Sequence, residues 1–196
     1  MPTGKKIFVS TQNQGKLKEI RSILGTGEFE FISVQTIDGF PDIEETGTSF
    51  EENAIIKAEE SFKLTGIPSL ADDSGLSVDC LDGAPGVYSA RYAGENADDE
   101  GNLQKVLSEI KNFSPPYKAR YVCVLAFYDG ERLITTRGEC EGELIMEKRG
   151  NNGFGYDPIF VPEGFNKTMA ELNPEIKNKL SHRFKALEKM KEALLT

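Results

Sequence analysis

Four carboxylates in two short motifs are the residues of this sequence best suited to acid–base or metal chemistry. Glu44 and Glu45 lie in "EETG", and Asp72 and Asp73 are adjacent in "LADDSG". Carboxylate oxygens without histidine or cysteine suit a hard cation such as Mg²⁺ or Mn²⁺, and a carboxylate near such a cation can deprotonate a water. The alternative, solvated turn residues, is favoured for "EETG" alone. It is weaker for "LADDSG", because the preceding residues are typical of the end of a buried strand.

A polar loop near the start of the chain has the composition of an anion-binding turn. The segment "STQNQGKLKE" joins a predicted strand to a predicted helix, and helix N-termini attract anions through their N–H groups and dipole. Asn13 and Lys16 add side-chain donors that suit a phosphate. The G-x-x-x-x-G-K-[ST] spacing of a Walker A loop is absent. Taken alone, the segment is equally compatible with an ordinary surface loop.

Two later motifs carry groups that suit a nucleobase. In "GFGYDP" an exposed Phe154 or Tyr156 would stack on a base, and Asp157 would accept a hydrogen bond from a ring N–H. In "SHRF" the only histidine, His182, lies beside Arg183 at the start of a predicted helix. A tight turn and a helix start explain the same residues without any ligand.

Alternating strands and helices must position these motifs. The sequence predicts strands at 5–10, 28–34 and 68–73, and a hairpin over 117–142 around Asp129-Gly130. It predicts helices at 17–24, 48–65, 102–110 and 181–195, and loops at 38–48, 81–101 and 149–158. This order is typical of an α/β protein with a mixed central β-sheet flanked by helices.

The helix predicted from Thr48 has two distinct faces. Thr48-x-x-Glu51 reads as a capping box at its start. Apolar residues recur at every fourth position and should face the core: Phe50, Ala54, Ala58 and Phe62. Asn53 and Lys57 form a polar pair on another face.

Composition and charge exclude several classes of protein. The chain has 196 residues and a net charge of −9, which argues against a protein that coats nucleic acid. No apolar run approaches the length that spans a bilayer, and "MPTGKKIFVS" is too short in apolar residues for a signal peptide. The cysteines lack C-x-x-C spacing and read as small buried residues of a reduced, cytoplasmic protein: Cys80, Cys123 and Cys140.

Together, five segments closely resemble the inosine triphosphate pyrophosphatase family, also called non-canonical purine NTP pyrophosphatases or XTP/dITP diphosphatases. They are "STQNQGKLKEI", "EETGTSFEENAIIKA", "LADDSGLSVDCLDGAPGVYSARYAG", "GFGYDPIF" and "KLSHRFKAL". The resemblance runs from about residue 5 to residue 190, in order. It departs at Ser10, where a small apolar residue is common, and within "SVDCL", and neither departure touches a ligand position.

The resemblance implies a reaction and an architecture. The family cleaves ITP, dITP and XTP between the α- and β-phosphates with Mg²⁺, for which Mn²⁺ would be a substitute. It implies one nucleotide pyrophosphatase domain over 1–196, elongated and two-lobed with a substrate cleft. The implied partners are a purine nucleoside triphosphate and a second copy of the chain in a homodimer, with no nucleic acid and no membrane.

The resemblance also assigns roles residue by residue. Glu45 and Asp73 would hold the metal, Asp73 would be the general base, and Asp72 would support the acidic site. The substrate-binding residues of the first half would be Thr11, Gln12, Asn13, Gln14, Gly15, Lys16, Lys57 and Ser74. Those around the base would be Phe154, Gly155, Tyr156, Asp157, Lys177, His182 and Arg183. The residue that rejects guanine is not identified.

Two other functions remain open at this point. The chain could be a pyrophosphatase that prefers modified pyrimidine or methylated nucleotides. It could also be a nucleotide-binding sensor without catalysis, although a sensor needs no general base and the acidic motifs argue against it.

Overall fold

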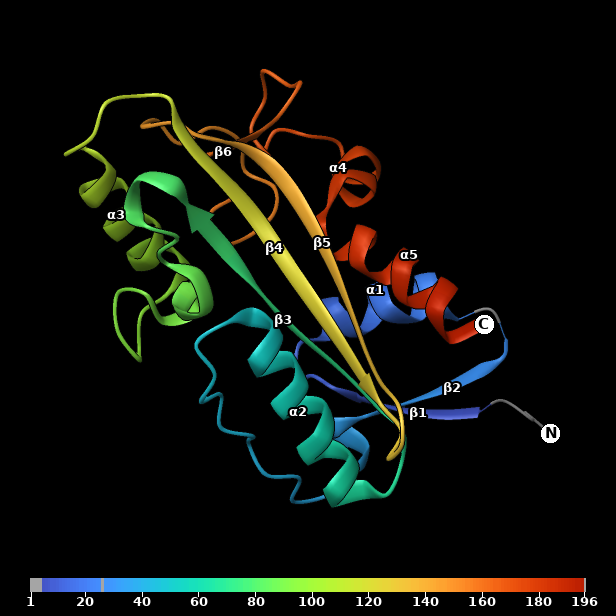
Figure 1. Ribbon diagram of the computed structural model, residues 1–196. Helices are drawn as coiled ribbons and strands as arrows, with labels where there is room; N and C mark the ends of the chain where they lie inside the picture. Colours follow the sequence, from blue (N-terminus) through green and yellow to red (C-terminus); the bar gives the residue numbers. More distant parts are fainter. Residues whose placement is uncertain (1–4, 26, 196) are drawn as a thin grey trace. The chain divides into compact units, whose positions relative to one another are not determined.

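The central element of the fold is a β-sheet, which contains the "LADDSG" motif. A computed structural model describes residues 5–25 and 27–195, which excludes the first four residues of the segment considered above as a signal peptide. The strands are β1 (Lys5–Ser10), β2 (Phe29–Ser33), β3 (Ser69–Val78), β4 (Tyr117–Tyr128), β5 (Leu133–Leu144) and β6 (Phe160–Pro162). In the described residues they form one sheet in the order β2-β1-β3-β4-β5-β6 (Figure 1). β1 pairs in parallel with β2 and β3, and β5 pairs antiparallel with β6, so the predicted mixed sheet is confirmed.

The α-helices lie between strands of the chain and after the last strand. They are α1 (Gln14–Leu24), α2 (Phe50–Thr65), α3 (Asp99–Ile110), α4 (Pro174–Leu180) and α5 (His182–Leu195). Short 3₁₀ segments lie at Val34–Thr36, Asp79–Leu81 and Gly86–Arg91. Asp79–Leu81 borders the long loop expected over 81–101 and Gly86–Arg91 interrupts it, and α4 was not predicted. Within the described residues, no helix is long and apolar enough to cross a membrane.

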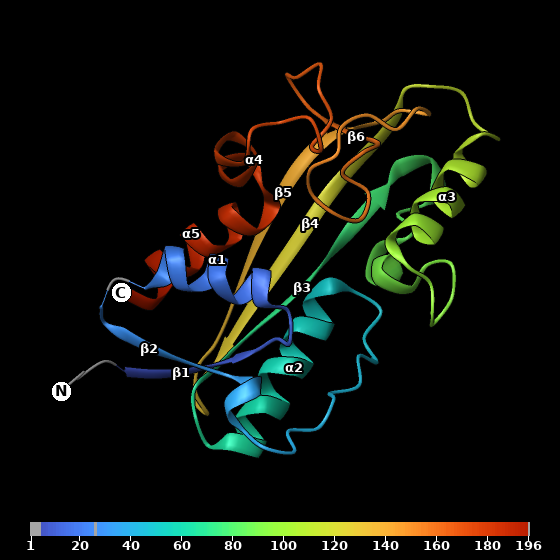
Figure 2. The ribbon, with the colours of Figure 1, turned by 180° about the vertical axis from the view of Figure 1, so that it is seen from behind.

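The chain divides into two compact units, and the first contains the first and the last of the described residues. Unit 1 comprises residues 1–73, 123–138 and 183–196, of which the described ones contain β1, α1, β2, α2 and nearly all of α5. Its core joins strand residues to α1 and α5 and consists of Ile7, Val9, Leu17, Ile20, Leu24, Leu70, Cys123, Leu125, Phe127, Ala186, Leu187 and Met190. Because α1 and α5 share this core, they lie beside each other (Figure 2).

Unit 2 has a core of its own. It comprises residues 74–122 and 139–182, which contain α3, β6 and α4. The α3 face Leu103, Val106, Leu107 and Ile110 packs with residues of β3, β4 and β5 and of the 156–172 segment in one buried cluster. The Cys140 thiol belongs to this cluster and Cys123 to that of unit 1, so two of the three cysteines are buried thiols as expected.

The helix starts differ from the predicted ones by a few residues. α2 is capped by Ser49, whose side chain accepts from the Glu52 N–H, and Glu52 Oε2 accepts from the Thr48 N–H at 2.7 Å. The predicted Thr48–Glu51 capping box is therefore wrong by one residue. α1 begins at Gln14, three residues earlier than predicted, because Asn13 acts as its N-cap.

β3 also extends further than expected. The sequence places the end of this strand at Asp73, but the strand continues through Ser74 and Gly75 to Val78. Gly75 is needed for packing rather than for a break. A Cβ atom there would lie 2.3 Å from Ser89 Oγ and 2.6 Å from the Gly86 carbonyl oxygen.

Candidate functional site

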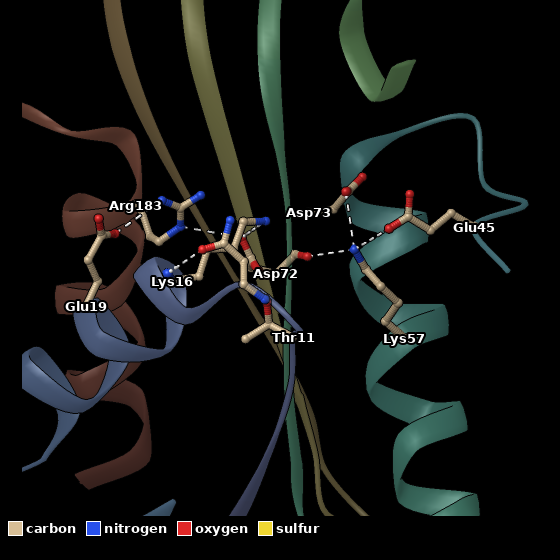
Figure 3. A network of polar contacts seen from close by, with 9 residues as sticks. Thr11, Lys16, Glu19, Glu45, Lys57, Asp72, Asp73 and Arg183 are labelled. Carbon is tan, nitrogen blue, oxygen red and sulfur yellow. Dashed lines mark hydrogen bonds and ion pairs between the residues drawn. The ribbon is translucent and has the colours of Figure 1, made fainter. Parts of the chain in front are cut away.

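The adjacent carboxylates lie in the middle of β3, where they point in opposite directions. Successive side chains of a strand face opposite sides of the sheet. Asp72 therefore faces α1 and α5, and Asp73 faces α2 (Figure 3). Both side chains are buried, with 3% and 7% of their residue surface exposed. Because the side chains of β3 alternate between the two faces of the sheet, each carboxylate has its own partners, and the two can be adjacent in sequence.

Asp73 shares one lysine with Glu45. The Lys57 ammonium, on α2, lies 2.6 Å from Glu45 Oε1 and 3.3 Å from Asp73 Oδ1, and it donates to the Asp72 carbonyl oxygen at 2.7 Å. Burial raises the pKa of Asp73, and the nearby Glu45 carboxylate adds to the rise. Burial acts to lower the pKa of Lys57, but the surrounding carboxylates outweigh it and raise that pKa. On this side of β3, two carboxylates therefore contact one cation, the Lys57 ammonium.

The Glu45–Asp73 pair fits Mg²⁺. Among the described residues, no group of three or more histidine, cysteine, aspartate or glutamate side chains could hold a metal. Mg²⁺ is nevertheless usually bound through only one or two carboxylates, since it keeps waters and binds substrate phosphates at its other positions. Because both carboxylates already converge on the Lys57 ammonium, their geometry suits a cation.

Asp72 is held by two cations on the other side of β3. Its Oδ2 lies 2.8 Å from Lys16 Nζ and 3.4 Å from Arg183 Nε, and Arg183 Nη1 lies 3.1 Å from Glu19 Oε2 (Figure 3). Burial alone would raise the pKa of Asp72, but Lys16 and Arg183 outweigh it and hold that pKa well below its usual range. Asp72 thus remains charged in a buried network that links α1, β3 and α5.

The polar loop 11–13 orients the start of α1. Thr11 Oγ1 accepts from the Asn13 N–H at 3.2 Å, and Asn13 Oδ1 accepts from the Lys16 N–H at 3.1 Å. Gln12 donates to Asp42 Oδ1 at 2.6 Å. The predicted phosphate loop is therefore half loop and half helix, because Gln14, Gly15 and Lys16 form the first turn of α1.

Asp157 organises the glycine-rich loop of unit 2. Its Oδ2 accepts from the Phe154 N–H at 2.9 Å and from Lys177 Nζ at 2.6 Å, and its Oδ1 accepts from the Tyr121 hydroxyl at 3.2 Å. The Gly155 N–H donates to Asp99 Oδ2 at 2.8 Å. These contacts bring together most of the residues assigned to the base.

The two aromatic residues of this loop differ in exposure. Phe154 is 66% exposed, and Lys177 Nζ lies 5.4 Å from the centre of its ring. Tyr156 is only 5% exposed, and its hydroxyl donates to the Ser89 carbonyl oxygen at 2.7 Å. Of the two rings considered for stacking on a base, Phe154 is therefore the accessible one.

His182 and Arg183 are adjacent in sequence but have different partners. The His182 ring stacks on Tyr121 within unit 2, with ring centres 5.0 Å apart and planes at 13°. Arg183 is buried in unit 1, where it contacts Asp72 and Glu19. The structure thus gathers His182 with Lys177 and Asp157 through Tyr121, while contact of Arg183 with the base stays a prediction.

Comparison with known proteins identifies the family. The model of the Ham1 family matches residues 7–193, nearly the whole chain. This chain belongs to the Ham1 family. The match confirms the family resemblance predicted from the five motifs.

Relatives of the Ham1 chain are similar over their full length. It is 46% identical to a dITP/XTP pyrophosphatase of Oceanobacillus iheyensis, over 98% of this chain and 99% of the relative. It is 49% identical to a dITP/XTP pyrophosphatase of Bacillus subtilis, over 97% of each. The structure of a HAM1 protein from Coxiella burnetii matches it with a TM-score of 0.92 and 46% identity, covering 97% of this chain and 98% of that one.

Three polar residues of this Ham1 chain were not assigned to the site from sequence. Glu19 pairs with Arg183, Tyr121 joins Asp157 to His182, and Asn53 donates to Asp73. Only Asn53 had a usable signal, since it lies four residues before Lys57 on one helix face. Glu19 and Tyr121 depend on contacts that the sequence does not reveal, because their partners are distant along the chain.

Proposed function

We propose that this chain is a dITP/XTP pyrophosphatase that hydrolyses non-canonical purine nucleoside triphosphates (ITP, dITP and XTP) to the monophosphate and pyrophosphate. Support comes from the names of its full-length relatives and from the carboxylates and cations of unit 1. The single observation that carries the proposal is the convergence of Glu45 and Asp73 on the Lys57 ammonium. A sensor without catalysis needs no general base, whereas this pair places the buried Asp73 carboxylate beside the half-buried Glu45 carboxylate.

Asp73 is the proposed general base. A carboxylate with a raised pKa takes a proton from water more readily than an ordinary one, and Asp73 has such a pKa because of its burial. Glu45 and Asp73 would hold Mg²⁺, which supplies positive charge for the phosphate oxygens when bound. The water, once deprotonated, attacks the α-phosphorus. The bond from that phosphorus to the bridging oxygen breaks, and pyrophosphate leaves with the bridging oxygen and the electron pair.

The cations of unit 1 would bind the triphosphate. Lys16 lies in the first turn of α1, where the N–H groups and dipole of the helix also favour an anion. Lys57 contacts the two carboxylates that would hold the metal. When the triphosphate binds, its ammonium would move from these carboxylates toward the phosphates. Thr11 to Gly15 and Ser74 complete the proposed phosphate contacts.

The residues of unit 2 would bind the base. Phe154 offers an exposed ring for stacking, and Asp157, Lys177 and His182 lie beside its loop. His182 or Arg183 would donate a hydrogen bond to O6 of a 6-oxopurine. Adenine would bind less well, because its 6-amino group is also a donor. We further propose that the whole chain acts as one domain, as a cytoplasmic homodimer, with neither nucleic acid nor membrane as partner.

The inorganic product tests the proposed function. With Mg²⁺, we expect dITP, ITP and XTP to release pyrophosphate and the monophosphate, and ATP to react far more slowly. The measurement is a product assay by ion-exchange chromatography over these nucleotides, GTP and a methylated and a pyrimidine nucleotide, with and without Mg²⁺. Orthophosphate as the first product, preference for the pyrimidine or methylated nucleotide, or binding without hydrolysis would each contradict the proposal.

A second prediction tests the base contact. Phe154→Ala should raise the KM for dITP, because stacking of a base on an aromatic ring contributes about 1–3 kcal/mol. We expect kcat to change much less than KM, since the ring has no role at the phosphates. The matched control is Phe113→Ala, which removes another exposed phenylalanine, 45% exposed, from the same unit. An unchanged KM in Phe154→Ala would remove this ring from base binding.

A further inference from the structure

Asn53 is a polar residue buried on α2. Its residue surface is 0% exposed, and the neighbouring buried positions of the helix are Phe50, Ala54 and Ala58. Burying an amide costs free energy unless its polar atoms are hydrogen-bonded. Both ends of the Asn53 amide are used: Nδ2 donates to Asp73 Oδ2 at 3.2 Å, and Oδ1 accepts from the Gly47 N–H at 2.8 Å.

Asn53 and Lys57 connect the same two segments. They lie one turn apart on α2, so their side chains leave the helix on one face. Lys57 contacts Glu45 and one oxygen of Asp73, and Asn53 contacts the other oxygen of Asp73. The second contact of Asn53 is to Gly47, two residues after Glu45. Each side chain therefore bridges the loop that carries Glu45 and the strand that carries Asp73.

Gly47 shows how closely the loop is held against Asn53. A Cβ atom at position 47 would lie 2.7 Å from Asn53 Oδ1 and 2.6 Å from Glu52 Cβ. Such distances require the neighbours to move, so only glycine allows the loop to approach the amide this closely. The contact between the loop and α2 therefore depends on two residues, Asn53 on the helix and Gly47 in the loop.

The two bridging residues differ in how firmly they hold the carboxylates. Lysine has a flexible stem and a charge that a triphosphate attracts, so Lys57 would leave its carboxylates in part when substrate binds. Asn53 is short, buried and neutral, and its contacts do not compete with a phosphate. With Lys57 on the substrate, Asn53 would remain as the fixed link between the two segments.

We propose that Asn53 is a positioning residue that sets the distance and orientation of Glu45 and Asp73 for the metal. The inference rests on the proposed function, because that function assigns both carboxylates to Mg²⁺. Residues that hold metal ligands through hydrogen bonds commonly contribute 10–100-fold to metal affinity. Asn53 acts on the metal only through the two residues that it orients.

The test compares Asn53→Ala with a matched control on the same helix. Ser61→Ala also truncates a fully buried polar residue of α2, whose hydroxyl lacks a hydrogen-bond partner in the described residues. Mn²⁺ binding to the nucleotide-free proteins is measured by electron paramagnetic resonance and water-proton relaxation. We expect Asn53→Ala to weaken Mn²⁺ binding about tenfold or more, with Ser61→Ala unchanged. In steady-state assays at saturating metal, Asn53→Ala should lower kcat for dITP more than it raises KM.

Gly47→Ala perturbs the same bridge without altering the amide, and it keeps the test decisive if Asn53→Ala does not fold. Gly47→Ala should also weaken Mn²⁺ binding. Its effect should be smaller when Asn53→Ala is already present, because the added Cβ then no longer clashes with Asn53 Oδ1. Folded variants that bind Mn²⁺ within twofold of wild type would overturn the inference, as would a wild type that binds no Mn²⁺. Failure of the proposed function is a separate result, seen as a wild type that releases no pyrophosphate from dITP.

Discussion

Asp73→Asn is expected to lower kcat for dITP by about 10²–10⁴, the usual contribution of a general base. The substitution removes the proton acceptor and one of the two carboxylates proposed for the metal while keeping the shape of the side chain. The amide oxygen at position 73 would still accept from Asn53 or from Lys57, so the strand and α2 should remain in place.

The same substitution should leave the stability of the fold unchanged or raise it. Burial raises the pKa of Asp73, so the folded protein binds the proton of this carboxyl more tightly than the unfolded chain does. The charged form therefore costs stability above the pKa of the folded state, and a neutral amide removes that cost. A site that is unfavourable for folding but needed for activity is a common trade-off in enzymes.

Two measurements on wild type and Asp73→Asn check these predictions. The rate of dITP hydrolysis tests the loss of kcat, and the melting temperature without metal or nucleotide tests the stability. Asp79→Asn is the matched control: it neutralises a carboxylate just after β3 that pairs with Arg120 at 3.0 Å, and its rate should stay within about twofold of wild type, as for most surface changes. Near-normal turnover in Asp73→Asn would remove Asp73 from the base role. A melting temperature well below wild type would show instead that the carboxylate stabilises the fold.

The sequence predicts the elements of this fold better than their ends. Periodicity and turn residues locate β1, the β4–β5 hairpin and α5, because these signals are local. The end of β3 was wrong because Ser74 and Gly75 normally favour a turn, whereas here the glycine permits close packing against Ser89. The placement of Asp72 and Asp73 on opposite faces follows from a strand period of two, once the strand is known to continue.

The partners of the site residues are less predictable than the residues themselves. Arg183 contacts Asp72 across 111 positions of sequence, and Tyr121 contacts Asp157 across 36. No local pattern encodes such pairs, since they depend on how the strands and helices pack. The family resemblance predicted which residues form the site, but it did not predict that Arg183 contacts Glu19 and Asp72.

Asp72→Asn should produce the opposite result to Asp73→Asn, a large loss of stability. Lys16 and Arg183 hold Asp72 charged in a buried position, and removing one partner of a buried ion pair typically costs about 3–5 kcal/mol. The loss arises because two cations then lie beside a neutral amide, with Glu19 left to balance Arg183. Chemical denaturation at neutral pH measures this free energy, and Glu19→Gln, which removes the half-exposed partner, should cost less.

The pH dependence of stability separates the charge of Asp72 from its shape. Since the pKa of Asp72 is lower in the folded protein than in the unfolded chain, where it is about 3.9, its charge contributes fully above that pH. The contribution is lost as the pH falls through the lower pKa of the folded state. The difference in unfolding free energy between wild type and Asp72→Asn should therefore be constant near neutrality and shrink below about pH 4. If this difference does not change with pH, packing and not charge explains the loss of stability in Asp72→Asn. The charge of Asp72 would then not stabilise the fold, and Asp72 and Asp73 would not differ in the electrostatic way inferred from their opposite positions on β3.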